Sequence, residues 1–99
     1  MATFRMTVAK GPQGEIQAYG NYVSGTEPVL VERVIIEELD ATGNTMGSFV
    51  YHLNRSVDPT PGAYLLASKS PSGPNVKFAR ASAWYEVVDG FVRSDRLAL

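Results

Sequence analysis

The sequence predicts an all-β protein, and three features of it carry that prediction. Short apolar runs, rich in β-branched and aromatic residues, recur at regular intervals along the chain. Clusters of Gly, Pro, Asn, Asp and Ser separate these runs. The chain has 99 residues, 44% of them hydrophobic, which suits one core but not two. We therefore expect residues 1–99 to form a single-domain antiparallel β-sandwich of about seven strands, with a small β-barrel as an alternative.

The N-terminal part predicts two strands joined by a tight turn. Residues 3–9 alternate between apolar and polar side chains, which is typical of a half-buried strand. A Gly-Pro-Gln-Gly turn leads from there into a second strand over 15–23. Gly20 stands in the apolar register of that strand and indicates a bulge or a close backbone approach.

Residues 29–39 are the ambiguous segment. Their length and their Glu and Leu content are compatible with a helix, which would make the fold α+β. On a helical wheel, however, Glu38 falls between Val31 and Val34 and interrupts the apolar stripe. Most of the apolar residues are Val or Ile, which favour strands. We expect a long central strand covered on both faces.

The remaining segments predict a hairpin partner and three further strands. Residues 46–53 follow an Asp-Ala-Thr-Gly-Asn turn and should pair with the central strand. Residues 63–67 form a short strand between two proline-rich loops, which cannot join the ladders. Residues 76–88 form the first arm of a final hairpin. In strand count and spacing alone, the pattern resembles immunoglobulin-like and fibronectin-like sandwiches.

The final hairpin carries a strong local turn signal. Asp89-Gly90 is a preferred pair for a two-residue type I′ turn. Such a turn would place Glu86 directly opposite Arg93, and this opposite charge pair supports the register.

Composition argues against several function classes. The net charge is −1 and the Lys and Arg residues are dispersed, so we expect no nucleic-acid binding. The chain has no Cys and one His, so we expect no thiolate or transition-metal site and no cofactor. No apolar run approaches the roughly 20 residues of a membrane span. No signal peptide is visible, which makes a cytoplasmic location the default expectation.

His52 is the candidate for catalysis, because His most often serves as a general base near neutral pH. Ser56 and Asp58 lie close by in the sequence, but no Gly-x-Ser-x-Gly nucleophile motif is present. We therefore expect no enzyme, and a small enzyme using His52 ranks third among the possible functions.

Aromatic residues point instead to a binding surface. Trp84 and Tyr85 occupy opposite faces of one strand, so both cannot lie in a single core. A two-layer sandwich has one interior, and the surplus apolar faces predict a partner surface. We expect a non-catalytic binding or assembly module that is a homo-oligomer. The alternative is a small-ligand domain, for carbohydrate for example, that uses Trp84 and Tyr85. The candidate interface or ligand-binding residues are Trp84, Tyr85, Val88, Phe91, Arg93, Tyr51 and His52.

Overall fold

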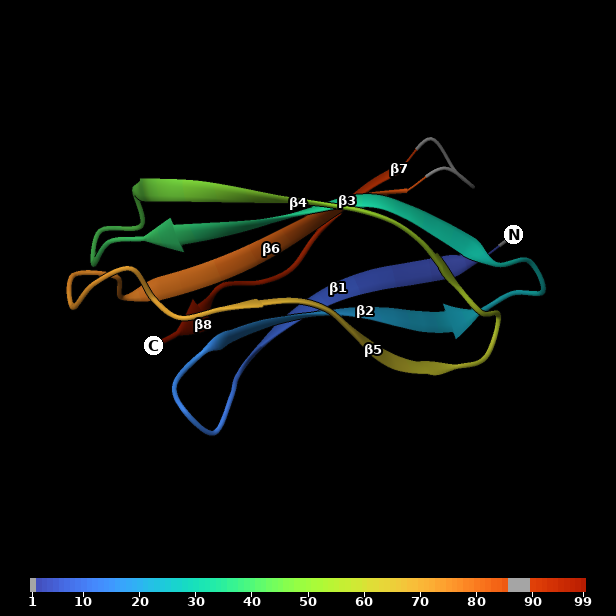
Figure 1. Ribbon diagram of the computed structural model, residues 1–99, viewed down its shortest axis with the longest axis horizontal. Helices are drawn as coiled ribbons and strands as arrows, with labels where there is room; N and C mark the ends of the chain where they lie inside the picture. Colours follow the sequence, from blue (N-terminus) through green and yellow to red (C-terminus); the bar gives the residue numbers. More distant parts are fainter. Residues whose placement is uncertain (1, 86–89) are drawn as a thin grey trace.

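The computed structural model describes residues 2–85 and 90–99, and every regular element in them is a strand. The strands form two antiparallel sheets packed against each other (Figure 1), which confirms the predicted all-β sandwich in preference to the barrel. The strands are β1 (Thr3–Lys10), β2 (Ile16–Ser24), β3 (Val29–Leu39), β4 (Thr45–Val57), β5 (Gly62–Lys69), β6 (Phe78–Tyr85), β7 (Gly90–Arg93) and β8 (Leu97–Ala98). The two-residue β8 raises the count above the expected seven, because the final stretch pairs with β6 in two separate pieces.

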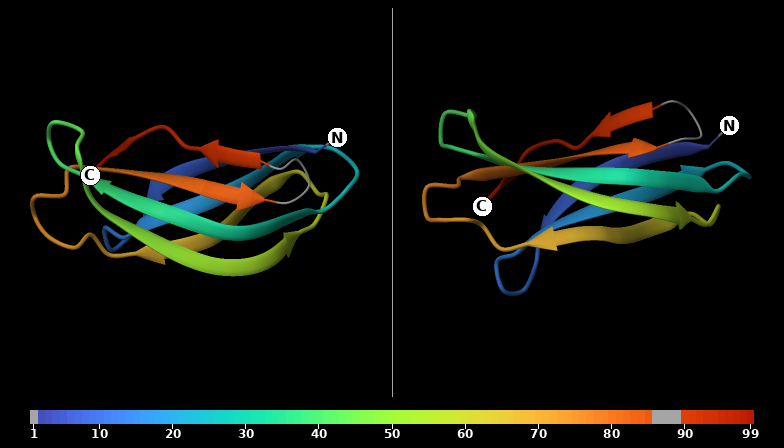
Figure 2. Two further views of the ribbon diagram at one scale, coloured as in Figure 1. Left: turned by 90° about the horizontal axis from the view of Figure 1, so that it is seen from above. Right: turned by 45° about the horizontal axis from the view of Figure 1, so that its top comes forward.

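The strand order divides the chain between the two layers. Sheet A has the order β1-β2-β5, and sheet B has the order β4-β3-β6-β7 with β8 also paired to β6. Figure 2 (left) looks onto sheet B and shows β4 and β7 at its two edges. Strands one, two and five also lie opposite strands three, six and seven in constant-type immunoglobulin sandwiches, but β4 differs, because here it lies beside β3 and not in the sheet of β1, β2 and β5. This likeness concerns architecture and carries no function.

Residues 29–39 form the strand β3, so the helical alternative is wrong. The strand lies between β4 and β6 and pairs with both. Its register shifts between Val31 and Arg33, which leaves Glu32 as an extra residue in a β-bulge. The bulge resets the alternation, so Val31 before it and Val34 after it both face the core. This interruption of the two-residue period is why the segment is ambiguous in the sequence.

Alternating side chains from both sheets build the core between them. Gly20 sits in this core, and a Cβ there would collide with the Phe4 ring and with Leu66. The close approach expected at Gly20 is therefore present. The buried residues of the main cluster include Phe4, Met6, Ile16, Ala18, Tyr22, Val31, Val34, Ile36, Ala79, Ala81, Ala83 and Tyr85.

The last hairpin has a different register from the predicted one. Arg93 pairs with Ser82, so the predicted pairing of Arg93 with Glu86 is wrong. Gly90 pairs with Tyr85 and belongs to the strand β7, where the prediction had made it a turn residue. The Asp-Gly signal is purely local, whereas the register is set by the four residue pairs between β6 and β7.

Residues 86–89, including the predicted turn residue Asp89, lie outside the described residues. The predicted placement of Trp84 and Tyr85 on opposite faces of their strand nevertheless agrees with the structure. Trp84 and Phe91 lie directly opposite each other and are exposed, while Val92 packs against the core.

Candidate functional site

Four side chains form a row across the outer face of sheet B, one from each strand. His52 on β4 is the cross-strand neighbour of Arg33 on β3, and Arg33 is the neighbour of Trp84 on β6. Trp84 is in turn the neighbour of Phe91 on β7. Successive side chains of a strand point to opposite faces of the sheet. The neighbours of these four residues face the core, so the four side chains lie on the outer face.

A second row lies one step further along the same strands. It runs from Val50 through Ile35 and Ser82 to Arg93. Ser82 is buried there, whereas Val50 is 50% exposed. We use the name platform for the following residues of the two rows: His52, Arg33, Trp84, Phe91, Val50, Ile35 and Arg93.

The centre of the platform is an aromatic pair held between two cations. The rings of Trp84 and Phe91 have centroids 5.0 Å apart and an interplanar angle of 55°. The Arg33 guanidinium carbon lies 4.8 Å from the Trp84 ring centroid. The Arg93 guanidinium carbon lies 5.4 Å from the Phe91 ring centroid. Cation–π contacts of this kind contribute about 0.5–1 kcal/mol at exposed sites, so they fix the orientation of these side chains on the surface.

The aromatic pair remains open to solvent despite these contacts. Trp84 is 36% exposed and Phe91 is 42% exposed. Exposed apolar side chains that cluster on one face, with polar groups at the rim, are typical of interaction sites. Trp, Tyr and Arg are also the residues that most often dominate binding energy at protein interfaces.

The charges of the platform are positive. Beside it, Glu37 is held by Arg80 through Nε at 3.0 Å and Nη2 at 3.1 Å. These hydrogen bonds from Arg80 keep the pKa of Glu37 below its usual value, against the opposing effect of burial. Within residues 2–85 and 90–99, neither Arg33 nor Arg93 makes an ion pair, although the charge of Arg93 also helps to lower the pKa of Glu37.

Four of the predicted site residues come together on the platform. They are His52, Trp84, Phe91 and Arg93, which the sequence places on two separate segments. Pairing of both β4 and β6 with β3 brings these segments into one surface.

Two of the predicted residues, Tyr85 and Tyr51, are not part of this surface. Tyr85 is buried, with its ring 5.5 Å from that of Phe4. Tyr51 points toward the inner face and packs against the core cluster. Val88 lies outside the described residues. Trp84 and Tyr85 therefore cannot form one ligand site, because they face opposite sides of sheet B.

Sequence reasoning missed Arg33, Ile35 and Val50. Arg33 joins the outer face only because the bulge at Glu32 shifts the alternation of β3. The signal in the sequence was the adjacent Glu32-Arg33 pair within a run of apolar residues, which marks a possible bulge.

His52, the residue considered for catalysis, lies at the β4 end of the platform. It is exposed, and no hydrogen bond to it occurs in the described part of the chain. Its nearest neighbour across the strand is the cation Arg33. Across the same residues, no group of three or more His, Cys, Asp or Glu side chains is placed to hold a metal ion.

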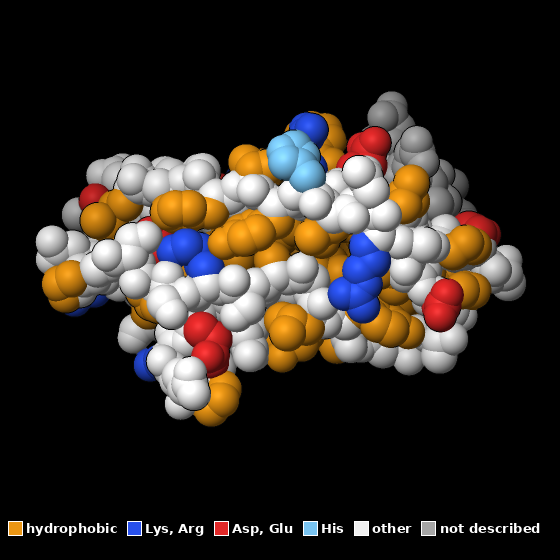
Figure 3. Space-filling model, viewed as in Figure 1, with side chains coloured by type: hydrophobic (Ala, Val, Ile, Leu, Met, Phe, Trp, Pro, Cys, Tyr) orange, Lys and Arg blue, Asp and Glu red, His pale blue; other side chains and the backbone are white. Residues whose placement is uncertain are grey.

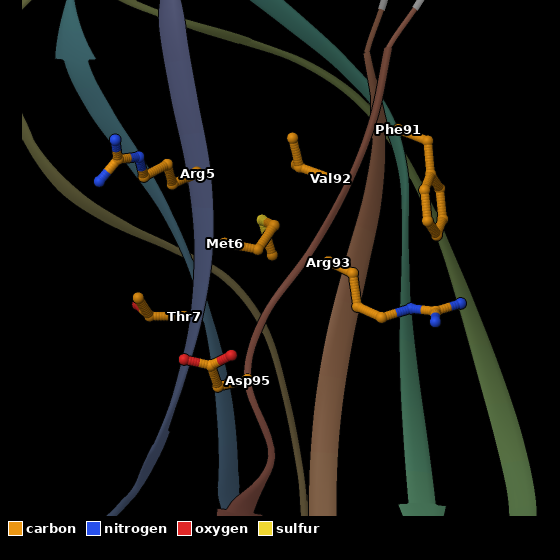
Figure 4. A pocket seen from close by; sticks show the side chains of 7 residues that line it. All are labelled: Arg5, Met6, Thr7, Phe91, Val92, Arg93 and Asp95. Carbon is orange, nitrogen blue, oxygen red and sulfur yellow. The ribbon is translucent and has the colours of Figure 1, made fainter.

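A groove lies at one side of the sandwich, where β1 ends sheet A and β7 ends sheet B. Its volume is about 570 Å³. Figure 4 shows Met6 and Val92 extending into the space between the two strands, with the carboxyl group of Asp95 directed toward β1. The groove is lined by Arg5, Met6, Thr7, Phe91, Val92, Arg93 and Asp95. It thus shares Phe91 and Arg93 with the platform.

Comparisons with known proteins found no matching family model, no matching curated protein and no matching solved structure. Within the described residues, no helix is long and apolar enough to cross a membrane.

Proposed function

We propose that the protein is a non-catalytic binding module that docks its platform onto an acidic surface of another protein. The observation that supports this proposal is the outward Trp84–Phe91 pair flanked by two stacked guanidiniums. An aromatic anchor with adjacent Arg side chains is the usual composition of an interface hot spot.

Carbohydrate binding receives less support from the same geometry. A sugar ring stacks on an open aromatic face, whereas Arg33 already lies over Trp84 and Phe91 packs against it. Tyr85, the second aromatic in that hypothesis, is buried. A sugar would have to displace one of these neighbours before it could stack.

Charge favours a different partner over a second copy of the chain. Two platforms facing each other would bring together cations from both copies, and juxtaposed like charges cost binding energy. A surface that carries Asp or Glu would instead pair with Arg33 and Arg93. A second copy of the chain, which the homo-oligomer expected from the sequence would require, is therefore the competing partner for the platform. An experiment must distinguish it from an acidic protein.

A displayed library of random peptides, panned against the purified protein, tests this proposal. Trp84 is the only tryptophan, so its fluorescence reports binding at the platform directly. We expect the selected peptides to be rich in Asp and Glu. Trp84→Ala lacks this fluorophore, so its affinity is compared with that of wild type by isothermal titration calorimetry, and we expect it to be about 30-fold weaker, the effect of a typical hot spot.

Val23→Ala is the matched control, because Val23 is an exposed apolar residue on sheet A. It should leave the binding unchanged. Equal binding by wild type and Trp84→Ala would overturn the proposal. Light scattering that shows a dimer in the wild type and a monomer in Trp84→Ala would replace the acidic partner with a second copy.

A further inference from the structure

The strand β4 forms a long open edge of sheet B. Among the described residues β4 pairs only with β3, and its 13 residues make it the longest of the strands. Figure 2 (left) shows the middle of β4 as the outermost strand on its side of the sandwich, with β5 behind it and not beyond it. An edge of this kind is a template for pairing with another chain.

Hydrogen bonds elsewhere in sheet B show which way the backbone of β3 is directed. Ser94 donates its N–H to the carbonyl of Ala81 at 2.7 Å, so the backbone groups of Ala81 face β7. Successive residues of a strand direct these groups to opposite sides, which turns those of Ser82 toward β3. Ser82 pairs with Ile35, so Ile35 is bonded to β6 and its neighbour Ile36 is bonded to β4.

The same alternation identifies the free groups of β4. Ile36 pairs with Phe49, so the N–H and C=O groups of Phe49 are bonded to β3. Those of Ser48, Val50 and His52 therefore point away from β3. They lie on the side of β4 where the described residues place no partner strand.

This part of β4 lacks the features that usually protect a sheet edge, which are charged side chains, Pro and bulges. The pairing of β4 with β3 is irregular at Met46 and again after His52, where Asn54 has a φ of 45°. Residues 47–52 between these points are in continuous register and include no Pro, Lys, Arg, Asp or Glu. Short uncharged segments of this type pair readily with copies of themselves.

We propose that the protein forms a twofold-symmetric dimer in which β4 pairs antiparallel with β4 of a second copy. One register bonds all the free residues to one another: Val50 lies opposite its own copy, and Ser48 lies opposite His52. Each pair then exchanges two backbone hydrogen bonds. Because the twofold axis passes between the two copies of Val50, the same surface is used by both chains and the assembly closes at two.

The side chains of this register fit a second copy of the chain. Val50 is 50% exposed on the outer face, and its copy would cover it. On the inner face Phe49 would stand opposite Tyr51, and aromatic cross-strand pairs stabilise antiparallel sheets. His52 would meet the neutral Ser48, so no charge would lie directly opposite a like charge.

The basic platform does not oppose this pairing. Directly opposite residues of an antiparallel pair point to the same face, so the two platforms would lie side by side and would not face each other. Arg33 is on β3, one strand in from the edge, which separates it from its copy by at least three strand spacings, about 14 Å. Repulsion over that distance is largely screened, because the Debye length is about 8 Å at physiological salt.

The inference goes beyond the proposed function and does not depend on it. Pairing at the edge uses the backbone of β4, whereas the aromatic pair of the platform lies on β6 and β7. The dimer should therefore persist in Trp84→Ala, which removes the centre of the platform. Loss of the dimer in Trp84→Ala would overturn the inference, because it would place the second copy on the platform.

Analytical ultracentrifugation of the intact chain, at concentrations up to about 1 mM, tests the dimer. Val50→Lys and Val50→Glu should each weaken it by at least about tenfold, since like charges would then meet at the axis. An equimolar mixture of these two variants should restore a dimer, because opposite charges would meet there. A wild type that stays monomeric at about 1 mM, or a mixture that associates no better than either variant alone, would overturn the inference.

Val23→Lys is the matched control, because Val23 is 44% exposed on β2 in the other sheet. It should leave the dissociation constant unchanged, and an effect equal to that of Val50→Lys would overturn the inference.

Amide hydrogen exchange in the wild type checks the register without any substitution. The amides of Ser48, Val50 and His52 should exchange slowly in the dimer and rapidly after dilution to the monomer. The amides of Phe49 and Tyr51 should be slow in both states, since they are bonded to β3. Rapid exchange at Ser48, Val50 and His52 in a dimeric sample would overturn the inference, because the interface would then lie elsewhere.

Discussion

The two open sides of the sandwich are built differently. On the side of β4 and β5, side chains bridge the sheets: Arg55 Nη1 donates to the carbonyl of Leu65 at 2.9 Å. The buried carboxylate of Glu38 on β3 accepts a hydrogen bond from Lys69 Nζ at 2.6 Å. Figure 3 views this side and shows basic side chains lying over the hydrophobic seam between the sheets.

On the side of β1 and β7, the described residues show no such bridge. The two strands leave a groove of about 570 Å³ between them, and among the described residues the charged side chains that line it form no ion pair across it. Unprotected sheet edges promote unwanted association, so natural proteins usually cover or charge them. The contrast between the bridged side and the hollow side predicts that polar side chains contribute more to stability at β4 and β5 than at β1 and β7.

Breaking the Glu38–Lys69 pair should produce the largest loss of stability. Lys69→Met keeps an apolar stem of similar size but leaves the Glu38 carboxylate, 2% exposed, without its cation. Loss of one partner of a buried ion pair costs about 3 kcal/mol, which urea unfolding would measure.

The matched control lies on the hollow side, where Arg5→Met removes an exposed cation. It should change the free energy of unfolding by less than about 0.5 kcal/mol. The double variant Glu38→Leu/Lys69→Met should recover part of the loss, since an apolar pair can replace a buried ion pair. Equal destabilisation by Lys69→Met and Arg5→Met would contradict the contrast between the two sides.

The same pair should make stability depend on acidic pH. Burial by itself raises the pKa of Glu38, but the hydrogen bonds from Lys69 and Ser72 outweigh it, so the pKa lies below its ordinary value of 4.5. A carboxyl group whose pKa is lowered in the folded state stabilises the fold above the ordinary value. This stabilisation is lost as the pH falls through the lowered pKa.

We therefore expect the urea midpoint to fall as the pH drops below 4.5, and to fall less steeply in Glu38→Gln. The lowered pKa values of Glu37 and Asp40 should leave some acid dependence in that variant. Parallel pH profiles for the two proteins would show that Glu38 does not contribute.

Local patterns in the sequence were sufficient for the fold and for the direction of most side chains. Strict alternation in 3–9 and in the final hairpin identified the inner and outer faces, including the opposite sides of Trp84 and Tyr85. These predictions succeeded because the two-residue period of a strand depends only on neighbouring residues. No knowledge of strand order was needed.

The features that the sequence did not predict depend on residues that are far apart in the chain. The bulge at Glu32 and the register of the last hairpin are set by pairing between strands, which the turn signal at Asp89 does not contain. Lys69 meets Glu38 across 31 positions of the chain. The groove likewise combines the first and seventh strands, so no local motif could have revealed it.

Removal of the second bridge should have a smaller effect than removal of the first. Arg55→Ala deletes an exposed hydrogen bond to the carbonyl of Leu65, and that carbonyl can then bond to water. We expect a loss of about 0.5–1 kcal/mol in urea unfolding, the usual net value of one hydrogen bond. If Arg55→Ala lowered the free energy of unfolding as much as Lys69→Met, this expectation would be wrong. Arg55 would then contribute more to the contact between the two sheets than one exposed hydrogen bond normally does.

The hollow side can be tested by amide hydrogen exchange in the unmodified protein. If the backbone groups of Phe91 and Arg93 face the groove, their amide protons meet solvent, whereas that of Val92 is bonded to β6 and that of Ser94 to Ala81. Hydrogen exchange measured by NMR should therefore alternate along the strand, fast at Phe91 and Arg93 and slow at Val92 and Ser94. Fraying of the whole strand would instead give fast exchange at all four positions, because local opening exposes every amide of a segment together. Slow exchange at Arg93 would mean that its N–H already has a partner, and it would contradict the alternation of bonded and free amides inferred for β7.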